Sequence, residues 1–176
     1  FSKCPSKYLV RNLNFSVENG EIQLVYGNSG LGKSTLLKLI SGVGCGKVFW
    51  NGKIIFEKKN ISHKPIEKRK IGFLMQDRLL FPHFTVFENL LFVIPKLLPD
   101  KINIINETLE KTSMIDLAKL YPYQLSGGQA TRIACLRTFL SFPKAILLDE
   151  PFESLDIKTK ISFKKFVARE IKCRNI

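Results

Sequence analysis

The hydrophobic and polar positions of the chain predict short strands that alternate with amphipathic helices. Strands are predicted where apolar runs are bounded by turn residues or alternate with polar ones, at 13–17, 22–26, 71–75 and 145–148. Helices are predicted where apolar residues recur three and four positions apart, at 36–40, from 85 onward and over 157–172. No internal repeat or low-complexity tract interrupts this order.

The segment 48–56 carries the pattern of a β-hairpin. Two apolar runs, 48–50 and 53–56, flank Asn51-Gly52. This residue pair is the one that best fits a type I′ turn. A small antiparallel sheet is therefore predicted here.

Composition is that of one domain with a sizeable core. The chain has 176 residues, of which 45% are hydrophobic, and no apolar run approaches the roughly 20 residues that span a bilayer. We therefore expect a soluble protein. Residues 1–10, which begin with Phe1 rather than methionine, lack the apolar core of a secretory signal, so a start inside a gene is an alternative. The four cysteines are far apart without a C-x-x-C pair, which argues against zinc or a disulfide framework.

The net charge of +13 raises the question of a nucleic-acid partner or an anionic membrane surface. The lysines are scattered rather than gathered in a stripe. The densest cluster, 64–70, includes Pro65 and Glu67 and has the composition of a surface loop. The charge pattern therefore argues against nucleic-acid binding.

Residues 27–35 match the pattern G-x-x-x-x-G-K-[ST] of a phosphate-binding loop, between a predicted strand and a predicted helix. Glycines let backbone N–H groups turn inward around phosphates, and the helix N-terminus adds partial positive charge. Lys33 is expected to reach the β- and γ-phosphates, and Ser34 to bind Mg²⁺. A chance glycine-rich turn is the alternative, which the flanking elements disfavour. The predicted nucleoside triphosphate site comprises Gly27, Asn28, Ser29, Gly30, Leu31, Gly32, Lys33, Ser34 and Thr35.

The apolar run 146–148 ends in two acids, Asp149 and Glu150. A carboxylate at the end of a strand beside a phosphate loop can hold Mg²⁺ through water, and a second can deprotonate the attacking water. Two surface acids after a buried strand are also common without any function. The phosphate loop upstream favours the functional interpretation.

Between these two segments lies Leu125-Ser126-Gly127-Gly128-Gln129. With this LSGGQ signature the chain resembles the ATP-binding cassette ATPases, the motor subunits of ABC transporters. Further matching segments are Gln76 at the end of its strand, residues 80–90, which resemble bacterial importers, and Ser154-Leu155-Asp156. The resemblance covers nearly the whole chain.

The resemblance implies an α/β fold, a P-loop NTPase core with a parallel sheet, a small antiparallel β subdomain and a helical signature subdomain at about 85–140. Residues 1–176 would form a single, incomplete domain of this kind. It implies the cofactors ATP and Mg²⁺, with Glu150 and Gln76 as catalytic residues and with metal contacts from Ser34, Gln76 and Asp149. The signature residues Ser126, Gly127, Gly128 and Gln129 would contact ATP held by a second subunit in a head-to-tail dimer, and Asp156 would couple the two sites.

The resemblance also implies partners and a location. The chain would couple ATP hydrolysis to transport as a peripheral subunit on the cytoplasmic face of the bacterial inner membrane. Its partners would be membrane-spanning permease subunits, docking near residues 76–90, a second nucleotide-binding subunit and a solute-binding protein. The residues do not indicate the transported substrate.

Three departures from the family pattern stand out. Ala130-Thr131 replace a glutamine or arginine pair, which we interpret as a change in surface contacts. The aromatic residue that stacks on adenine should lie near Cys4, where Phe1 and Tyr8 are weak candidates. The switch histidine expected after Glu150 is absent, since His63 and His83 both precede the signature.

The chain is therefore interpreted as a subunit truncated at its C-terminus, and residues 1–176 alone are expected to be inactive and unstable. Two alternatives stay open. One is a non-catalytic remnant, and the other is an ABC ATPase that acts on nucleic acid or ribosomes.

Overall fold

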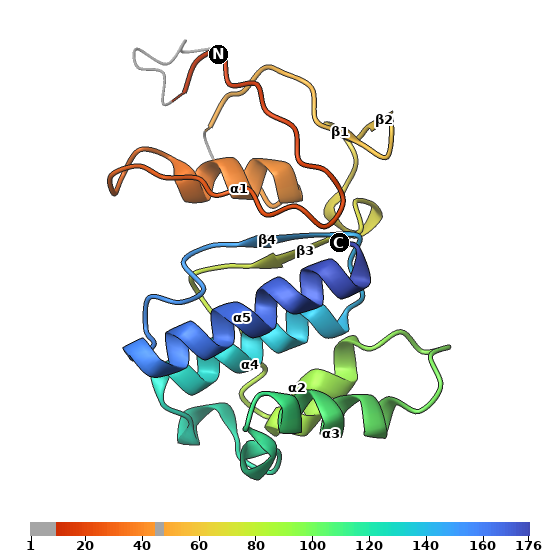
Figure 1. Ribbon diagram of the computed structural model, residues 1–176. Helices are drawn as coiled ribbons and strands as arrows, with labels where there is room; N and C mark the ends of the chain where they lie inside the picture. The colour runs from red at the N-terminus through yellow and green to blue at the C-terminus, as the bar shows by residue number, and fades with distance from the viewer. Residues whose placement is uncertain (1–9, 45–47) are drawn as a thin grey trace.

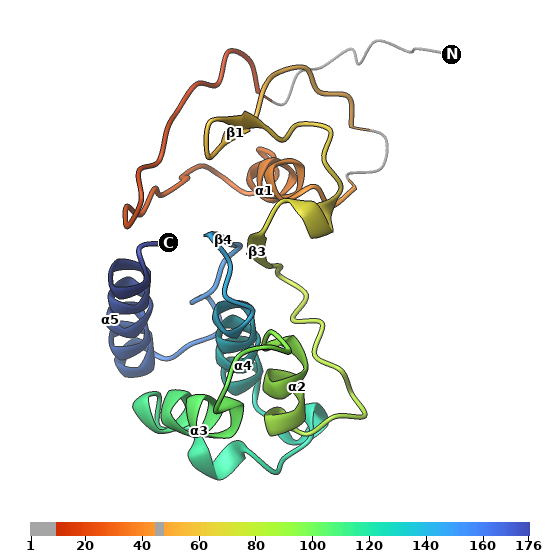
Figure 2. The ribbon, with the colours of Figure 1, turned by 90° about the vertical axis from the view of Figure 1, so that its right-hand side faces the viewer.

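The fold was analysed in a computed structural model, which describes residues 10–44 and 48–176. Figures 1 and 2 show helix α1 (Lys33–Ser41) on one face of a two-stranded sheet, and helices α4 (Gly127–Leu140) and α5 (Ile157–Arg174) on the other. Helices α2 (Val86–Val93) and α3 (Lys101–Lys111) lie beyond α4. Short 3-10 helices occupy Ile66–Lys68, Ile115–Leu117 and Pro122–Gln124.

The central sheet is parallel, as predicted. Strand β3 (Ile71–Leu74) pairs with β4 (Ala145–Leu148) in the register Ile71 to Ala145 and Leu74 to Leu148. The backbone N–H of Asp149 extends the ladder by donating to Leu74 at 3.0 Å. Because parallel strands end at the same edge, the residues that follow β3 and β4 are brought together there.

The strands predicted at 13–17 and 22–26 are wrong for this structure. Both segments lie outside the two sheets of the described residues, and large apolar side chains of the second are exposed: 61% of Leu24 and 86% of Tyr26. An apolar run becomes a strand only where a neighbouring strand pairs with its N–H and C=O groups. Within the described chain, β3 and β4 pair with each other instead.

The small antiparallel sheet is present, but its turn is not at Asn51-Gly52. Strands β1 (Ile55–Phe56) and β2 (Lys59–Asn60) are joined by Glu57 and Lys58, whose φ values of 47° and 60° suit a type I′ turn. Ile61, which is 3% exposed, donates its backbone N–H to Ile54 beside this hairpin. Ile61 is thus buried beside a hairpin that turns at Glu57 and Lys58, whereas the turn preference of Asn-Gly predicted a turn at residues 51–52.

The helices predicted from Thr85 onward are present and form the main core. Thr85 caps α2 in a capping box with Glu88, which fixes where the helix begins. The core between α2, α3 and α4 consists of fully buried side chains, among them Leu90, Ile105, Leu109, Ile133, Leu136 and Phe139. The boundaries of a helical subdomain stay a prediction.

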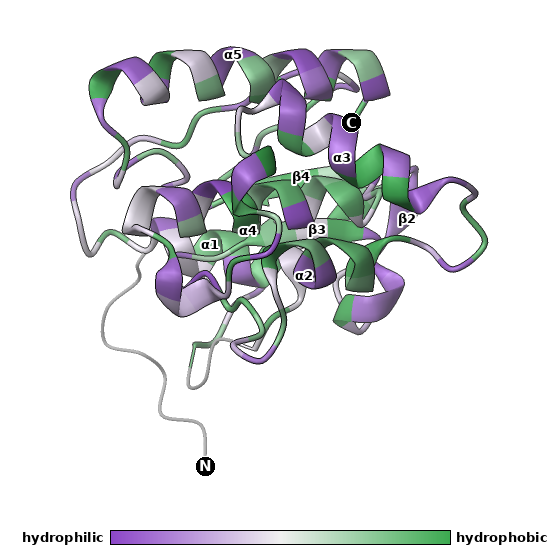
Figure 3. Ribbon diagram, turned by 90° about the horizontal axis from the view of Figure 1, so that it is seen from below, coloured by the Kyte–Doolittle hydropathy of each residue, from purple (hydrophilic) through white to green (hydrophobic). Residues whose placement is uncertain are grey.

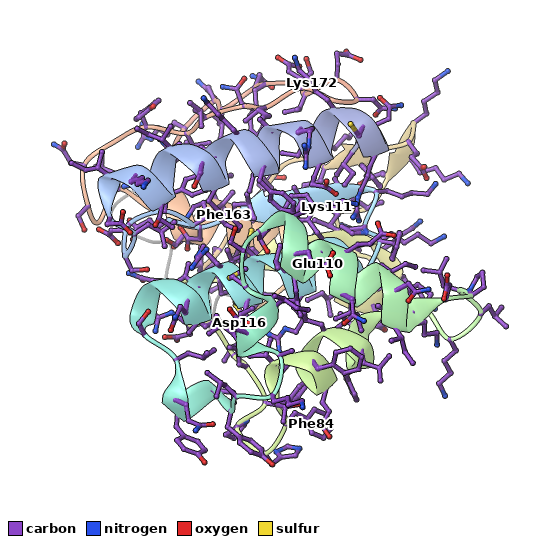
Figure 4. All side chains as sticks on the ribbon, turned by 60° about the horizontal axis from the view of Figure 1, so that its bottom comes forward. Phe84, Glu110, Lys111, Asp116, Phe163 and Lys172 are labelled. Atoms are coloured by element: carbon purple, nitrogen blue, oxygen red, sulfur yellow. The ribbon has the colours of Figure 1, made fainter. Side chains whose placement is uncertain are left out.

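Helix α5 is amphipathic, as the hydropathy colours in Figure 3 show along its length. Its buried residues recur at helical spacing and include Phe163, Val167 and Ile171. In Figure 4, Phe163 lies on the side of α5 that faces α4, whereas Lys172 lies on the opposite side. Among the described helices, none is long and apolar enough to span a bilayer.

Arg69 corrects the interpretation of residues 64–70 as a simple surface loop. Its side chain is only 5% exposed and donates hydrogen bonds of 2.8 Å to the backbone oxygens of Leu39, Ile40, Ser62 and Lys64. A cation at the C-terminus of α1 complements the helix dipole. Its guanidinium also explains Gly42, since a Cβ there would lie 2.7 Å from Arg69 Nε. Arg69 thus ties the loop to the helix that follows the phosphate loop.

Candidate nucleotide-binding and hydrolysis site

The phosphate loop leads directly into the N-terminus of α1. Gly30 and Gly32 have φ values of 81° and 89°, which residues with a Cβ rarely adopt. Gly32 caps the helix without any side-chain hydrogen bond. The N-cap residue itself thus offers no side chain to the N-terminus of α1, and the helix dipole adds positive charge at the same point. This geometry is suited to an anion such as phosphate.

The side chain of Lys33 folds back over the loop. Its Nζ donates to the backbone oxygens of Gly27 at 2.8 Å and Asn28 at 3.0 Å. The ammonium group is thus held at the mouth of the loop, beside the helix N-terminus. It supplies a point charge in the place where the sequence pattern expects one.

Ser34 and Asp149 meet across the boundary between α1 and β4. The Ser34 hydroxyl donates to Asp149 Oδ1 at 3.0 Å, although 115 positions separate the two residues. Asp149 is 6% exposed. A hydroxyl and a carboxylate are hard oxygen ligands, and Mg²⁺ usually binds one or two carboxylates together with phosphate oxygens. The donor set at this junction therefore fits Mg²⁺ next to a bound phosphate.

Gln76 and Glu150 meet at the edge where β3 and β4 end. The amide Nε2 of Gln76 donates to Glu150 Oε2 at 3.3 Å, and both side chains are exposed. Glu150 has a φ of 51°, in the left-handed region that residues other than glycine rarely adopt. Such strained residues concentrate at functional sites.

Neighbouring charged side chains shift the pKa of the Glu150 carboxyl. A hydrogen bond with Glu153 and its negative charge raise the pKa of Glu150, whereas the nearby charge of Lys33 lowers it. Two carboxylates that share a hydrogen bond resist simultaneous ionisation. The hydrogen bond between Ser34 and Asp149, the residue before Glu150, connects the start of α1 to the end of β4.

If Glu150 acts as a general base, replacing Glu153 by Gln is expected to shift the acid limb of the pH profile of phosphate release to lower pH. The substitution removes the group that raises the pKa of Glu150 most, so a base at this position would stay ionised further into the acid range. Rates of phosphate release measured from about pH 5 to pH 8 test this. Glu110→Gln, which removes an exposed carboxylate from α3, should leave the profile unchanged. An acid limb that does not move would remove Glu150 from the pH dependence.

The signature residues begin helix α4. Ser126 caps the helix by accepting from the N–H of Gln129 at 3.2 Å, and Gln129 Oε1 accepts from the Ser126 N–H at 2.8 Å. In Figures 1 and 2, α4 and α1 lie on opposite faces of the β3–β4 sheet. The signature and the phosphate loop of one chain are thus on different sides of the sheet.

Comparisons with known proteins identify the family. A family model described as "ABC transporter" matches residues 10–153. The chain belongs to the ABC transporter family. It is 38% identical over 172 residues to the uncharacterized ABC transporter ATP-binding protein YnjD of Escherichia coli, a match that covers 97% of this chain and 79% of YnjD.

Other members of the ABC family agree. A sulfate/thiosulfate import ATP-binding protein CysA of Neisseria meningitidis is 41% identical over 160 residues, covering 87% of this chain and 44% of CysA. The chain therefore spans less than half of this relative. A solved dimeric structure of the ATP-binding cassette MJ0796 bound to ADP and Pi matches with a TM-score of 0.81 at 27% identity, covering 96% of this chain and 77% of that one. The chain therefore has the fold of an ABC cassette and is related to the ATP-binding proteins of ABC transporters.

Two features of this ABC chain differ from the interpretation of its sequence. Arg69 was assigned to a surface loop although it is buried. Ala130 and Thr131 were interpreted as surface changes, but they are 7% and 8% exposed, so that interpretation is wrong. The signal for Thr131 lies in its position one helical turn after Gly127, which puts its hydroxyl at the start of α4. The adenine contact expected near Cys4, with Phe1 and Tyr8 as candidates, lies outside the described residues.

Proposed function

We propose that the complete protein that contains this chain hydrolyses ATP, with Mg²⁺, to drive transport through an ABC transporter, and the variants below are made in the complete protein. The observation that carries this proposal is the convergence of two pairs, Ser34 with Asp149 and Gln76 with Glu150, beside the phosphate loop. The first pair has the chemistry of a metal site and the second that of an acid–base site. Together they form the parts that phosphoryl transfer from ATP to water requires.

The residues take distinct roles in this proposal. Lys33 and the amides of residues 27–35 hold the phosphates, while Ser34, Asp149 and Gln76 hold Mg²⁺. When bound, the metal neutralises charge on the phosphates and helps to orient them. Glu150 accepts a proton from the attacking water at its carboxylate, and Gln76, bonded to that carboxylate, orients the water. The raised pKa of Glu150 makes it a stronger base once ionised.

The signature supports a composite site formed by two chains. Residues 126–129 begin α4, which lies across the sheet from α1, and this supports a contact between them and a nucleotide held by a second chain. The MJ0796 structure is a dimer bound to ADP and Pi. We therefore propose a head-to-tail dimer with ATP between the phosphate loop of one chain and the signature of the other, coupled through Asp156.

A surface for a membrane-spanning partner lies between Gln76 and α2. The rings of Phe81, His83, Phe84 and Phe92 contact one another, and 64% of Phe92 is exposed. Figure 4 shows Phe84 at the outer end of this region. We assign it to a permease subunit, which would hold the chain at the cytoplasmic face of a bacterial inner membrane, with a solute-binding protein on the other side.

The sequence identities between this chain and its relatives do not indicate which cargo is transported. The relatives include import proteins for sulfate/thiosulfate, at 41%, for spermidine/putrescine, at 38%, and for Fe(3+) ions, at 37%. These values are nearly equal although the cargoes differ in charge and size. This fits a chain that supplies energy and leaves cargo recognition to other subunits.

Mixing two inactive variants tests the composite site. Lys33→Ala removes the loop cation, whereas Ser126→Asp keeps a good helix cap but places a carboxylate where the signature would meet phosphate. Each variant alone is expected to be inactive. In a head-to-tail pair of the two, one site combines an intact loop with an intact signature, so the mixture should regain phosphate release. A mixture as inactive as its components would contradict the two-chain site.

A further inference from the structure

Thr131 forms a hydrogen-bonded junction between three segments of the site. Its Oγ1 accepts from Arg78 Nε at 2.8 Å, lies 2.9 Å from the backbone oxygen of Gly127, and lies 3.0 Å from the hydroxyl of Ser154. Arg78 comes two positions after Gln76, and Ser154 comes four positions after Glu150. One side chain of the signature helix thus touches the segments that carry both catalytic candidates.

The number of protons at this junction fixes the direction of each bond. A threonine hydroxyl has one proton to donate and two lone pairs that accept. The Gly127 oxygen can only accept and Arg78 Nε–H can only donate. All three bonds coexist only if Thr131 donates to Gly127 and accepts from both Arg78 and Ser154. Its hydrogen-bonding capacity is then used completely.

Close packing around the signature glycines supports the same junction. A Cβ on Gly128 would lie 3.0 Å from the backbone oxygen of Ser154, and a Cβ on Gly127 would lie 3.2 Å from Arg78 Nη2. The two segments that Thr131 binds therefore also press against the first residues of α4. Arg137, further along α4, donates a hydrogen bond to the backbone oxygen of Arg78 at 3.1 Å, which is a further contact between α4 and the segment that contains Arg78.

We propose that Thr131 is a positioning residue that links the start of the signature helix to the Gln76–Glu150 pair. This inference rests on the proposed function. A shift of α4 on contact with nucleotide would be transmitted through the Thr131 hydroxyl to Arg78 and Ser154, and from them to Gln76 and Glu150. Loss of the hydroxyl would leave ATP binding intact while the two catalytic side chains lose their alignment.

The test compares two isosteric substitutions on α4. Thr131→Val removes the junction. Thr138→Val serves as the matched control, because within residues 10–44 and 48–176 its hydroxyl donates to the backbone oxygen of Ala134 at 2.9 Å, one turn earlier in the same helix. Thr131→Val should lower kcat for phosphate release by about 10- to 100-fold, as small misalignments of catalytic groups do, with KM for ATP unchanged. Thr138→Val should behave like the wild type, and Thr131→Ser should restore kcat.

The results of these assays distinguish a failure of the positioning role of Thr131 from a failure of the proposed function. Equal kcat values for Thr131→Val and Thr138→Val, or no rescue by serine, would overturn the positioning role. A wild type without ATP hydrolysis would overturn the proposed function instead, and a double-mutant cycle would then decide on the junction. Melting shifts of Thr131→Val and Ser154→Ala that are less than additive in combination would support it, whereas simple addition would overturn it.

Discussion

In the complete protein, Glu150→Gln is expected to stall ATP hydrolysis while ATP binding is retained. An amide of the same shape can still accept a hydrogen bond from Gln76, which lies 3.3 Å from Glu150 Oε2, so the geometry of the pair is preserved. It cannot accept a proton from water. Loss of a general base typically costs about 10²- to 10⁴-fold in rate, and we expect phosphate release to fall within that range.

The measurements for this variant distinguish chemistry from assembly. Phosphate release and nucleotide binding are measured on the same preparation, with Glu110→Gln as the control for the loss of one exposed carboxylate. Size-exclusion chromatography with ATP and Mg²⁺ should show that the dimer of the variant persists, because the nucleotide is not consumed. Continued hydrolysis by a species that elutes only as monomer would contradict both the role of Glu150 and the composite site.

The helical part of the fold could be predicted because its signals are local. Thr85 and Ser126 each form a capping box with the residue three positions later, and Asp156 caps α5 through the N–H of Thr159. Helix spacing and caps lie within a few residues of one another, so a sequence shows them directly. Strands depend instead on partners elsewhere. Residues 22–26 carry a clear apolar run yet have no place in the two sheets of the described chain.

The difference between local signals and distant partners also explains which parts of the site could be predicted from the sequence. The residue types and spacings of the phosphate loop indicated Ser34, and the end of a buried run indicated Asp149, so their contact at 3.0 Å was within reach of pattern analysis. The contacts of Thr131 were not, since its partners Arg78 and Ser154 are 53 and 23 positions away. A buried polar side chain needs hydrogen-bond partners, but partners this far along the chain leave no pattern among its neighbouring residues.

In the complete protein, Lys33→Ala is expected to abolish tight ATP binding. In the structure, Lys33 Nζ bonds to the backbone oxygens of Gly27 and Asn28, so the ammonium both closes the loop and supplies its only positive side chain. A hydrogen bond to a charged group contributes about 1.5–3 kcal/mol, which corresponds to about 10- to 150-fold in affinity. The loss should lie at the upper end, because the loop also loses the group that holds its backbone oxygens.

Equilibrium binding of ATP at fixed ionic strength measures the effect of Lys33→Ala. The matched control is Lys38→Ala, which removes one positive charge from the same helix but on a later turn, so that the net charge changes equally. Long-range attraction between the protein and ATP should weaken to the same small extent in both variants, since exposed charges are screened beyond about 10 Å at 0.1 M salt. The difference between the two variants therefore isolates the contact in the loop. Equal affinities for ATP in Lys33→Ala, Lys38→Ala and the wild type would show that Lys33 does not contact the bound nucleotide.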